Sequence, residues 1–220
     1  MRKITDFNKW WKFHRGDIDD TAPTTKGPLY IQSKTERMKW GPACRYYTCY
    51  PDDYGNTHEI VRDRWDFVNL PHDYIIGGET KKENNNALGF FDYDNAWYRK
   101  EFVIPEEYAG KRITLEFDGV ATNCTVYFNG CILKRNFCGY TPFEVDITDF
   151  AEIGKTNVVA VYVDGTHFEG WWYSGAGIYR HVRLVATEKL CVEKYGVFNY
   201  AKKENGKKSK KIHSAGGLEF

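Results

Sequence analysis

Several features that would assign a chain of 220 residues to a common class are missing from this sequence. No apolar run approaches the roughly 20 residues that a transmembrane helix needs, and the N-terminus lacks the apolar core of a signal peptide. We therefore expect no membrane partner. The expected location is the cytoplasm, or the periplasm or cell exterior if a signal peptide was removed.

A surplus of charge of one sign is also missing. Lysine and arginine together number 31, against 30 aspartates and glutamates, which leaves a net charge of +1. Binding to the phosphates of nucleic acid depends on a strong positive surplus, at least locally. We expect no nucleic-acid partner.

Motifs for catalysis or cofactor binding are missing as well. The sequence holds no phosphate-binding loop, zinc motif or nucleophile elbow, and no local motif pairs two carboxylates. A TIM barrel needs about 250 residues, more than this chain provides. We therefore expect no cofactor, no metal and no catalytic residue within the chain, which by itself is not expected to be an enzyme.

The six cysteines give no clear disulfide or metal pattern. Cys124 and Cys131 flank a predicted tight turn and could lie close together, whereas Cys44 and Cys49 have no second pair at zinc spacing. A chain of this length does not depend on disulfides for its core, so free thiols are favoured. The acidic runs at 17–20 and 52–53 lack the spacing of a calcium loop and are interpreted as solvated turns.

Aromatic residues, by contrast, are plentiful: 16 Tyr, 14 Phe and 7 Trp, as sheet faces and sugar-stacking surfaces both favour. Short alternating apolar runs recur between residues 95 and 180 and are separated by turn residues. Asn129-Gly130 predicts a two-residue hairpin turn. Residues 157–163 are so continuously apolar that they predict a central strand covered on both faces. The pattern indicates an all-β antiparallel sandwich.

Domain limits follow from the same pattern. The segment 17–63 has no regular period and predicts a functional or wrapping loop. From residue 202 on, six lysines fall within ten residues. We predict one domain at 1–200 and a linker or artificial tail at 201–220. Further strands are predicted at 11–16, 64–70, 97–104, 112–118, 143–147, 180–186 and 190–200.

An ordered set of short phrases covers roughly residues 3–190. The set resembles the N-terminal sugar-binding domain of glycoside hydrolase family 2, the family of β-galactosidases, β-glucuronidases and β-mannosidases. It looks closest to the β-galactosidase branch. The phrases are 7–8 (Phe-Asn), 11–14 (Trp-Lys-Phe-His), 68–74 (Val-Asn-Leu-Pro-His-Asp-Tyr), 97–100 (Trp-Tyr-Arg-Lys), 117–120 (Phe-Asp-Gly-Val), 126–130 (Val-Tyr-Phe-Asn-Gly), 139–143 (Gly-Tyr-Thr-Pro-Phe), 146–148 (Asp-Ile-Thr) and 172–180.

The resemblance implies a jelly-roll β-sandwich of the galactose-binding-domain-like type. In the family, an immunoglobulin-like domain and a TIM barrel follow, and two glutamates of the barrel perform a retaining hydrolysis. The resemblance therefore implies an accessory carbohydrate-binding domain of a β-galactosidase-like enzyme, without the catalytic barrel. The implied partners are a β-galactoside-like saccharide and the remaining domains of the parent glycosidase.

The loop 164–180 is the sharpest candidate site. Sugars present C–H patches that stack on aromatic rings and hydroxyls that need paired donors and acceptors. The resemblance implies that this loop faces the active-site mouth of the complete enzyme. Alternatively, its last aromatic pair packs beneath the sandwich. The candidate ligand-binding residues are Asp164, His167, Glu169, Trp171, Trp172 and Tyr173, of which Trp172 and Tyr173 form that pair.

His72-Asp73 is the second candidate, as a polar rim of the sugar pocket. The alternative is that Asp73 caps nearby backbone amides while His72 is solvated. Arg180 is expected to pair with a carboxylate, either Asp118 or Asp146. Two other functions stay open for the chain: an autonomous carbohydrate-binding module, and a purely structural or assembly domain.

Overall fold

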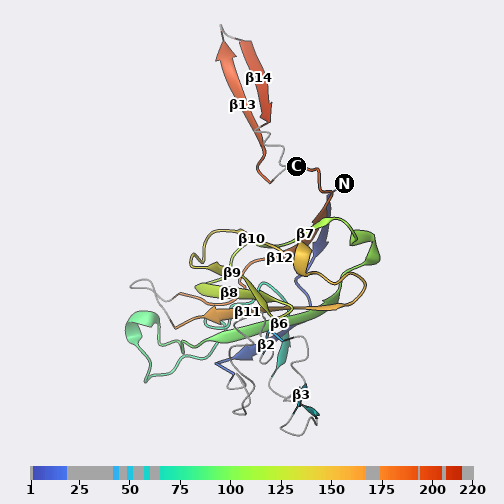
Figure 1. Ribbon diagram of the computed structural model, residues 1–220. Helices are drawn as coiled ribbons and strands as arrows, with labels where there is room; N and C mark the ends of the chain where they lie inside the picture. The colour runs from blue at the N-terminus through green and yellow to red at the C-terminus, as the bar shows by residue number, and fades with distance from the viewer. Residues whose placement is uncertain are drawn as a thin grey trace.

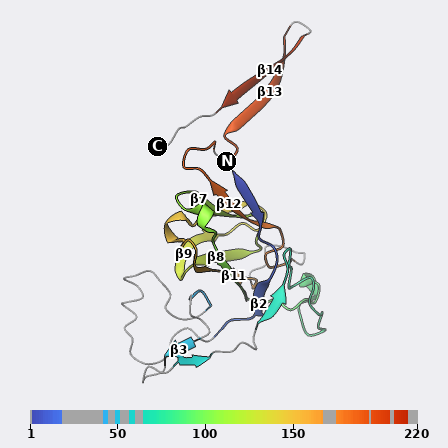
Figure 2. The ribbon, with the colours of Figure 1, turned by 90° about the vertical axis from the view of Figure 1, so that its right-hand side faces the viewer.

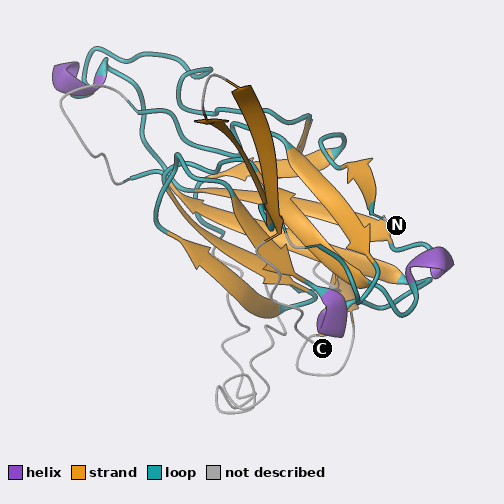
Figure 3. Ribbon diagram, turned by 90° about the horizontal axis from the view of Figure 1, so that it is seen from above, coloured by secondary structure: helices purple, strands orange, loops and turns teal. Residues whose placement is uncertain are grey.

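Two antiparallel sheets pack face to face in the computed structural model, as Figure 1 and Figure 3 show. The structure describes residues 2–18, 42–44, 49–51, 57–59, 65–166, 174–192, 194–204 and 207–214. Side chains are described in these ranges except at 49–51, 57–59, 198–204 and 207–214. The architecture is the expected all-β jelly-roll sandwich, and the only helices among the described residues are short 3-10 turns.

One sheet has four strands and the other has six. The four-stranded sheet runs β1 (Lys3–Asp6), β12 (Val182–Thr187), β7 (Arg112–Phe117) and β10 (Phe143–Asp146). The six-stranded sheet runs β5 (Asp66–Val68), β2 (Trp11–Arg15), β6 (Ala96–Val103), β11 (Thr156–Asp164), β8 (Asn123–Phe128) and β9 (Cys131–Asn136). The 3-10 turns are η2 (Asn86–Leu88), η3 (Glu106–Tyr108) and η4 (Thr148–Phe150).

The core lies between the sheets because alternate residues of each strand point inward. In β7, Ile113, Leu115 and Phe117 face the core, and Thr114 and Glu116 lie on the opposite face, also largely buried. Strand β11 lies between β6 and β8, as its continuous apolar run predicted. The Asn129-Gly130 turn joins β8 to β9 with both residues at positive φ, 48° and 85°, as the hairpin type demands.

The outer face of the six-stranded sheet carries a second apolar cluster, formed by Ile18, Ala43, Cys44, Trp97 and Ala160. Arg99 projects from the same face and is only 1% exposed. Its Nε donates to the carbonyl of Pro42 at 3.0 Å and its Nη2 to that of Cys44 at 3.2 Å. The described part of segment 17–63 therefore covers this face, in agreement with a wrapping role. β3 (Cys49–Pro51) and β4 (Thr57–Glu59) form a small separate ladder.

The C-terminal part differs from the sequence-based expectation. The strand predicted at 190–200 begins only at Val197, since the described residues before it, 188–192 and 194–196, are not in a strand. β13 (Val197–Glu204) and β14 (Lys207–Ser214) pair as a hairpin. Figures 1 and 2 show this hairpin extending away from the sandwich beside the N-terminus. The division into a domain at 1–200 and a tail at 201–220 stays a prediction.

The five cysteines with described side chains form no disulfide with one another. Cys44, Cys124 and Cys131 are buried, and Cys138 and Cys191 are exposed. Burial raises the pKa of the Cys124 thiol to about 12. Among the residues described, no helix is both long and apolar enough to cross a membrane.

Candidate functional site

The predicted site residues of the described chain meet at one end of the sandwich, which we call the sheet-end site: His72, Asp73 and Asp164, with the loop ends Thr166 and Ser174. Segment 72–74 lies alongside segment 176–178, because the His72 amide donates to the Ile178 carbonyl at 2.9 Å and the Tyr74 amide to the Ala176 carbonyl at 3.0 Å. Asp164 is the last residue of β11. The fold therefore brings together two candidate segments that are about ninety residues apart in the sequence.

Asp73 binds backbone amides from two segments. Its Oδ1 accepts from the amides of Ile75 at 3.0 Å and Ile76 at 2.9 Å, which closes the local turn. The same oxygen accepts from the Ala176 amide at 3.3 Å. Asp73 thus performs the amide-capping role that was the alternative to a ligand contact, and it also fixes the end of the 164–180 loop.

His72 is half-buried rather than solvated. Its ring lies edge-on to Phe13 with centroids 4.7 Å apart, and its Nδ1 is 2.8 Å from the Tyr98 hydroxyl. Burial lowers the pKa of His72, against an opposing contribution from Asp73. The Tyr98 hydroxyl also donates to the His72 carbonyl at 3.4 Å, and the tautomer of His72 decides which atom donates between that hydroxyl and Nδ1. The alternative, in which His72 is solvated, is therefore wrong for its ring, which packs against Phe13 and Tyr98.

Two glycines allow the close approach of the two segments. A Cβ on Gly175 would lie 1.8 Å from Oδ2 of Asp73. A Cβ on Gly177 would lie 2.5 Å from both the His72 carbonyl oxygen and the Tyr98 hydroxyl, and Gly177 has φ +132°. A side chain at either position would push segment 174–178 away from segment 72–74.

The loop that carries the remaining candidates is anchored at both ends. Asp164 Oδ1 accepts from the amide of Thr166 at 3.0 Å and from its hydroxyl at 2.7 Å. At the far end, the Ser174 amide donates to the Tyr93 hydroxyl at 3.0 Å. The other five predicted ligand contacts lie outside the described residues and stay predictions: His167, Glu169, Trp171, Trp172 and Tyr173.

Tyrosine hydroxyls form a set of contacts at this end of the sandwich that the sequence reasoning missed. The Tyr74 hydroxyl donates to the Asp94 carbonyl at 2.8 Å, and the Tyr162 hydroxyl donates to Asp17 at 3.0 Å. Burial raises the pKa of Tyr74 and of Tyr162, so both hydroxyls stay protonated near neutral pH. The signal was present in the sequence as tyrosines at the ends of predicted strands, where a ring packs inward and its hydroxyl reaches loop backbone.

The expected ion pair of Arg180 with a carboxylate is wrong. Arg180 is exposed, and its Nη1 donates to the backbone oxygens of Asp118 at 3.5 Å and Tyr140 at 3.3 Å. The Asp118 carboxylate instead accepts both Nη1 and Nη2 of Arg183, each at 2.7 Å. Asp146 accepts from Arg112 at 3.0 Å.

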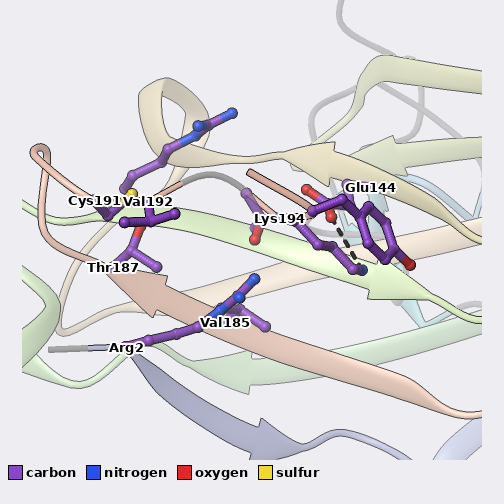
Figure 4. Close-up of a pocket in the computed structure, with 10 residues that line it drawn as sticks. Arg2, Glu144, Val185, Thr187, Cys191, Val192 and Lys194 are labelled. Carbon is purple, nitrogen blue, oxygen red and sulfur yellow. Dashed lines mark ion pairs between the residues drawn. The ribbon is translucent and has the colours of Figure 1, made fainter. Parts of the chain in front are cut away.

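A pocket of about 260 Å³ lies elsewhere, on the outer face of the four-stranded sheet (Figure 4). Two of its lining cations bind the buried carboxylate of Glu116: Nη2 of Arg2 at 3.0 Å and Nζ of Lys194 at 2.9 Å. Lys194 also lies 3.0 Å from Glu144. These contacts attach the segment after β12 to the sheet, and the charges of the pocket are largely neutralised. No group of three or more metal-binding side chains occurs among the described residues.

Comparisons with known proteins agree on one family. The sequence profile described as "Glycosyl hydrolases family 2, sugar binding domain" matches residues 87–188. The chain is 38% identical over 200 residues to a protein named Beta-galactosidase BoGH2A from Bacteroides ovatus, covering 90% of this chain and 20% of that protein. It is 36% identical over 124 residues to a putative beta-glucuronidase from Formosa agariphila, covering 55% of this chain and 12% of that protein.

A solved structure supports the same assignment. The crystal structure of a beta-glycosidase from Bacteroides vulgatus superposes with a TM-score of 0.69 at 29% identity, covering 96% of this chain and 24% of that one. The chain therefore spans about a fifth to a quarter of the length of these two Bacteroides proteins.

Proposed function

Because this chain belongs to glycoside hydrolase family 2 and carries its N-terminal sugar-binding domain, we propose that it serves a β-galactosidase-like glycosidase as an accessory carbohydrate-binding domain. The hydrolysis of the O-glycosidic bond belongs to the other domains of that enzyme, which are its partners. The single observation that carries the proposal is the extent of the match, 90% of this chain but only 20% of the β-galactosidase relative.

The chemistry of the described chain supports a role without catalysis. Retaining hydrolysis needs two carboxyl groups about 5 Å apart across a saccharide site. At the sheet-end site, Asp73 is bound to three backbone amides, and Asp164 binds Thr166 through both its amide and its hydroxyl. These carboxylates hold loops in place, which suits a binding domain.

The loop 164–180 is the proposed saccharide contact. Its described ends are held to Asp164 and to Tyr93, so the segment between them must begin and end at the same end of the sandwich. That segment contains two tryptophans, a tyrosine, a histidine and a glutamate, which together offer aromatic faces and hydrogen-bond partners. We propose that Trp171, His167 and Glu169 contact the sugar, while His72 and Asp73 position the loop.

The accessory role is tested by adding a chromogenic β-galactoside to the purified 220-residue chain. We expect no turnover above that of buffer, because the proposed role leaves hydrolysis to the other domains of the enzyme. Measurable turnover that survives further purification would refute an accessory role.

The binding role is tested by calorimetric titration with β-galactosides and β-1,4-galactan oligosaccharides. We expect Trp171→Ala to weaken binding at the sheet-end site. Tyr195→Ala, at an exposed aromatic residue in the turn before β13, should leave binding unchanged. Micromolar binding by the isolated chain would favour an autonomous carbohydrate-binding module. The absence of any binding, together with self-association in solution, would favour a purely structural role.

A further inference from the structure

An exposed pair of aromatic rings lies at an edge of the six-stranded sheet, and neither ring belongs to the sheet-end site. Trp10 is 70% exposed and Phe67 is 66% exposed. Their ring centroids are 6.3 Å apart with an interplanar angle of 78°. We call this pair the aromatic platform.

The backbone at Trp10 is held in an unfavourable conformation that presents the ring. Trp10 has φ 61°, in the left-handed region that bulky residues avoid. The conformation is fixed by its amide, which donates to Oδ1 of Asn69 at 3.1 Å, and by the adjacent Leu70 amide, which donates to the Asn8 carbonyl at 2.8 Å. The neighbouring Trp11 is fully buried. The fold thus places Trp11 in the core and directs the neighbouring Trp10 into solvent.

Charged groups lie beside the rings on the same face of the sheet. Phe67 is the cross-strand partner of Lys12, and Lys12 Nζ lies 3.4 Å from Oε1 of Glu101. The side chains of Lys12 and Glu101 are 30% and 40% exposed. The platform therefore has two apolar ring faces and, beside them, a cationic donor and an anionic acceptor that still contact water.

We propose that the aromatic platform is a second saccharide-binding surface, which takes a chain of β-linked pyranose sugars. A pyranose ring has a C–H face that stacks on an indole, and its hydroxyls bond to ammonium and carboxylate groups that remain hydrated. An interface with another protein would have to bury the Lys12–Glu101 pair, which costs desolvation. Exposed rings beside charged groups that remain hydrated therefore favour a saccharide over a protein as the ligand of the platform.

The platform is spatially separate from the sheet-end site. In the six-stranded sheet, Val163 of β11 pairs with Ala96 of β6, and Ala96 pairs with Arg15 of β2. Asp164 follows Val163 directly. The sheet-end site therefore lies at the Arg15 end of β2, whereas Trp10 precedes its other end. Strand geometry puts Trp10 about 17 Å from Arg15. The inference does not depend on which sugar the sheet-end site binds.

The test titrates the full 220-residue chain with a β-1,4-linked galactan tetrasaccharide and with cellotetraose. Trp10→Gly is the decisive variant, because glycine adopts a positive φ readily and the substitution removes a ring that is exposed. We expect it to fold with an unchanged or higher melting temperature and to raise the Kd for the better ligand about tenfold or more. Phe67→Ala should weaken binding less.

Tyr195→Ala is the matched control, since Tyr195 is also an exposed aromatic residue with positive φ (83% exposed, φ 64°) on a different face. Its Kd should equal that of the unsubstituted chain. If Trp10→Gly binds both saccharides as tightly as the unsubstituted chain, or if neither saccharide binds the unsubstituted chain, the proposal is wrong. A dimer that dissociates in Trp10→Gly, with saccharide affinity unchanged, would identify a second copy as the occupant and overturn it as well.

A loss of binding in Trp171→Ala alone would leave the proposed function standing and reject only the platform. A loss in Trp10→Gly alone would support the platform and count against the loop 164–180.

Discussion

The sheet-end site and the aromatic platform use their side chains in opposite ways. At the sheet-end site, Asp73 is bound to three amides of its own chain and His72 to Tyr98. On the platform, the rings of Trp10 and Phe67 lie mostly in solvent, although the backbone at Trp10 is strained to put one there. The polar groups of the sheet-end site thus make hydrogen bonds within the fold, whereas the rings of the platform are left accessible to solvent.

The largest expected effect is at Gly177, where an added Cβ would meet the backbone of the opposite segment of the sheet-end site. Gly177→Ala places a Cβ 2.5 Å from the His72 carbonyl oxygen and from the Tyr98 hydroxyl, at φ +132°. We expect a loss of about 3 kcal/mol in unfolding free energy, which lowers the melting temperature by about 6–12 °C in a chain of this size. The measurement is thermal unfolding followed by circular dichroism.

Gly110→Ala is the control for that substitution. Gly110 also has a positive φ, +75°, but a Cβ there meets nothing within 4 Å. Backbone strain alone should cost about 1 kcal/mol. Equal losses in the two variants would show that the contact between segments 72–74 and 174–178 does not stabilise the fold.

A smaller effect is expected at Asp73. Asp73→Ala removes the acceptor for three backbone amides, and we expect a loss of about 2 kcal/mol by urea denaturation. Asp73→Asn keeps an oxygen at the same place and should lose less than half as much. If asparagine and alanine were equally damaging, the negative charge rather than the capping geometry would be the important property of Asp73.

The pH dependence of stability tests the burial of His72. Its pKa is lowered from 6.5 in the folded chain, so the unfolded chain binds more protons below about pH 6.5. The contribution of His72 to stability is therefore complete above that pH and is lost as pH falls toward the folded-state pKa. His72→Asn keeps an oxygen acceptor for Tyr98 and removes the titration.

We expect the melting temperature of His72→Asn to fall less than that of the unsubstituted chain between about pH 7.5 and about pH 5.5. Identical pH profiles for the two proteins would mean that the His72 ring is not desolvated.

The smallest expected effect is at the platform. Phe67→Thr replaces an exposed ring with another strand-favouring residue, and we expect a change within about 0.5 kcal/mol in unfolding free energy. Urea denaturation is the measurement. A loss above about 1 kcal/mol would show that the ring packs as part of the core, and the contrast between the two regions would then fail.

The strands were predictable from the sequence because alternation and turn residues act locally. The apolar run at 157–163 is β11, between two neighbouring strands, and Asn129-Gly130 makes the expected hairpin turn. The partner of Asp118 was not predictable, since Arg180 and Arg183 stand three residues apart in one segment. Only the pairing of β12 with β7 decides that Arg183 reaches the carboxylate.

The candidate site was predictable only in part. The sequence predicted two candidate sugar-binding segments, and the fold brings segment 72–74 next to segment 174–178 at one end of the sandwich. The sequence did not reveal that the His72 ring packs against Phe13 and Tyr98, because these side chains come from two other strands.

By itself, the sequence determined the all-β sandwich, the central position of β11 and the resemblance to the sugar-binding domain of family 2. Each of these follows from residues close together in the chain: the alternation of apolar and polar residues, the turn-forming residues and the ordered motifs. Only the tertiary structure decided which polar groups bind each other and which rings stay in water. The reason is physical: hydrogen-bond partners and exposure depend on strand register and on backbone angles such as that of Trp10, which residue type alone does not specify.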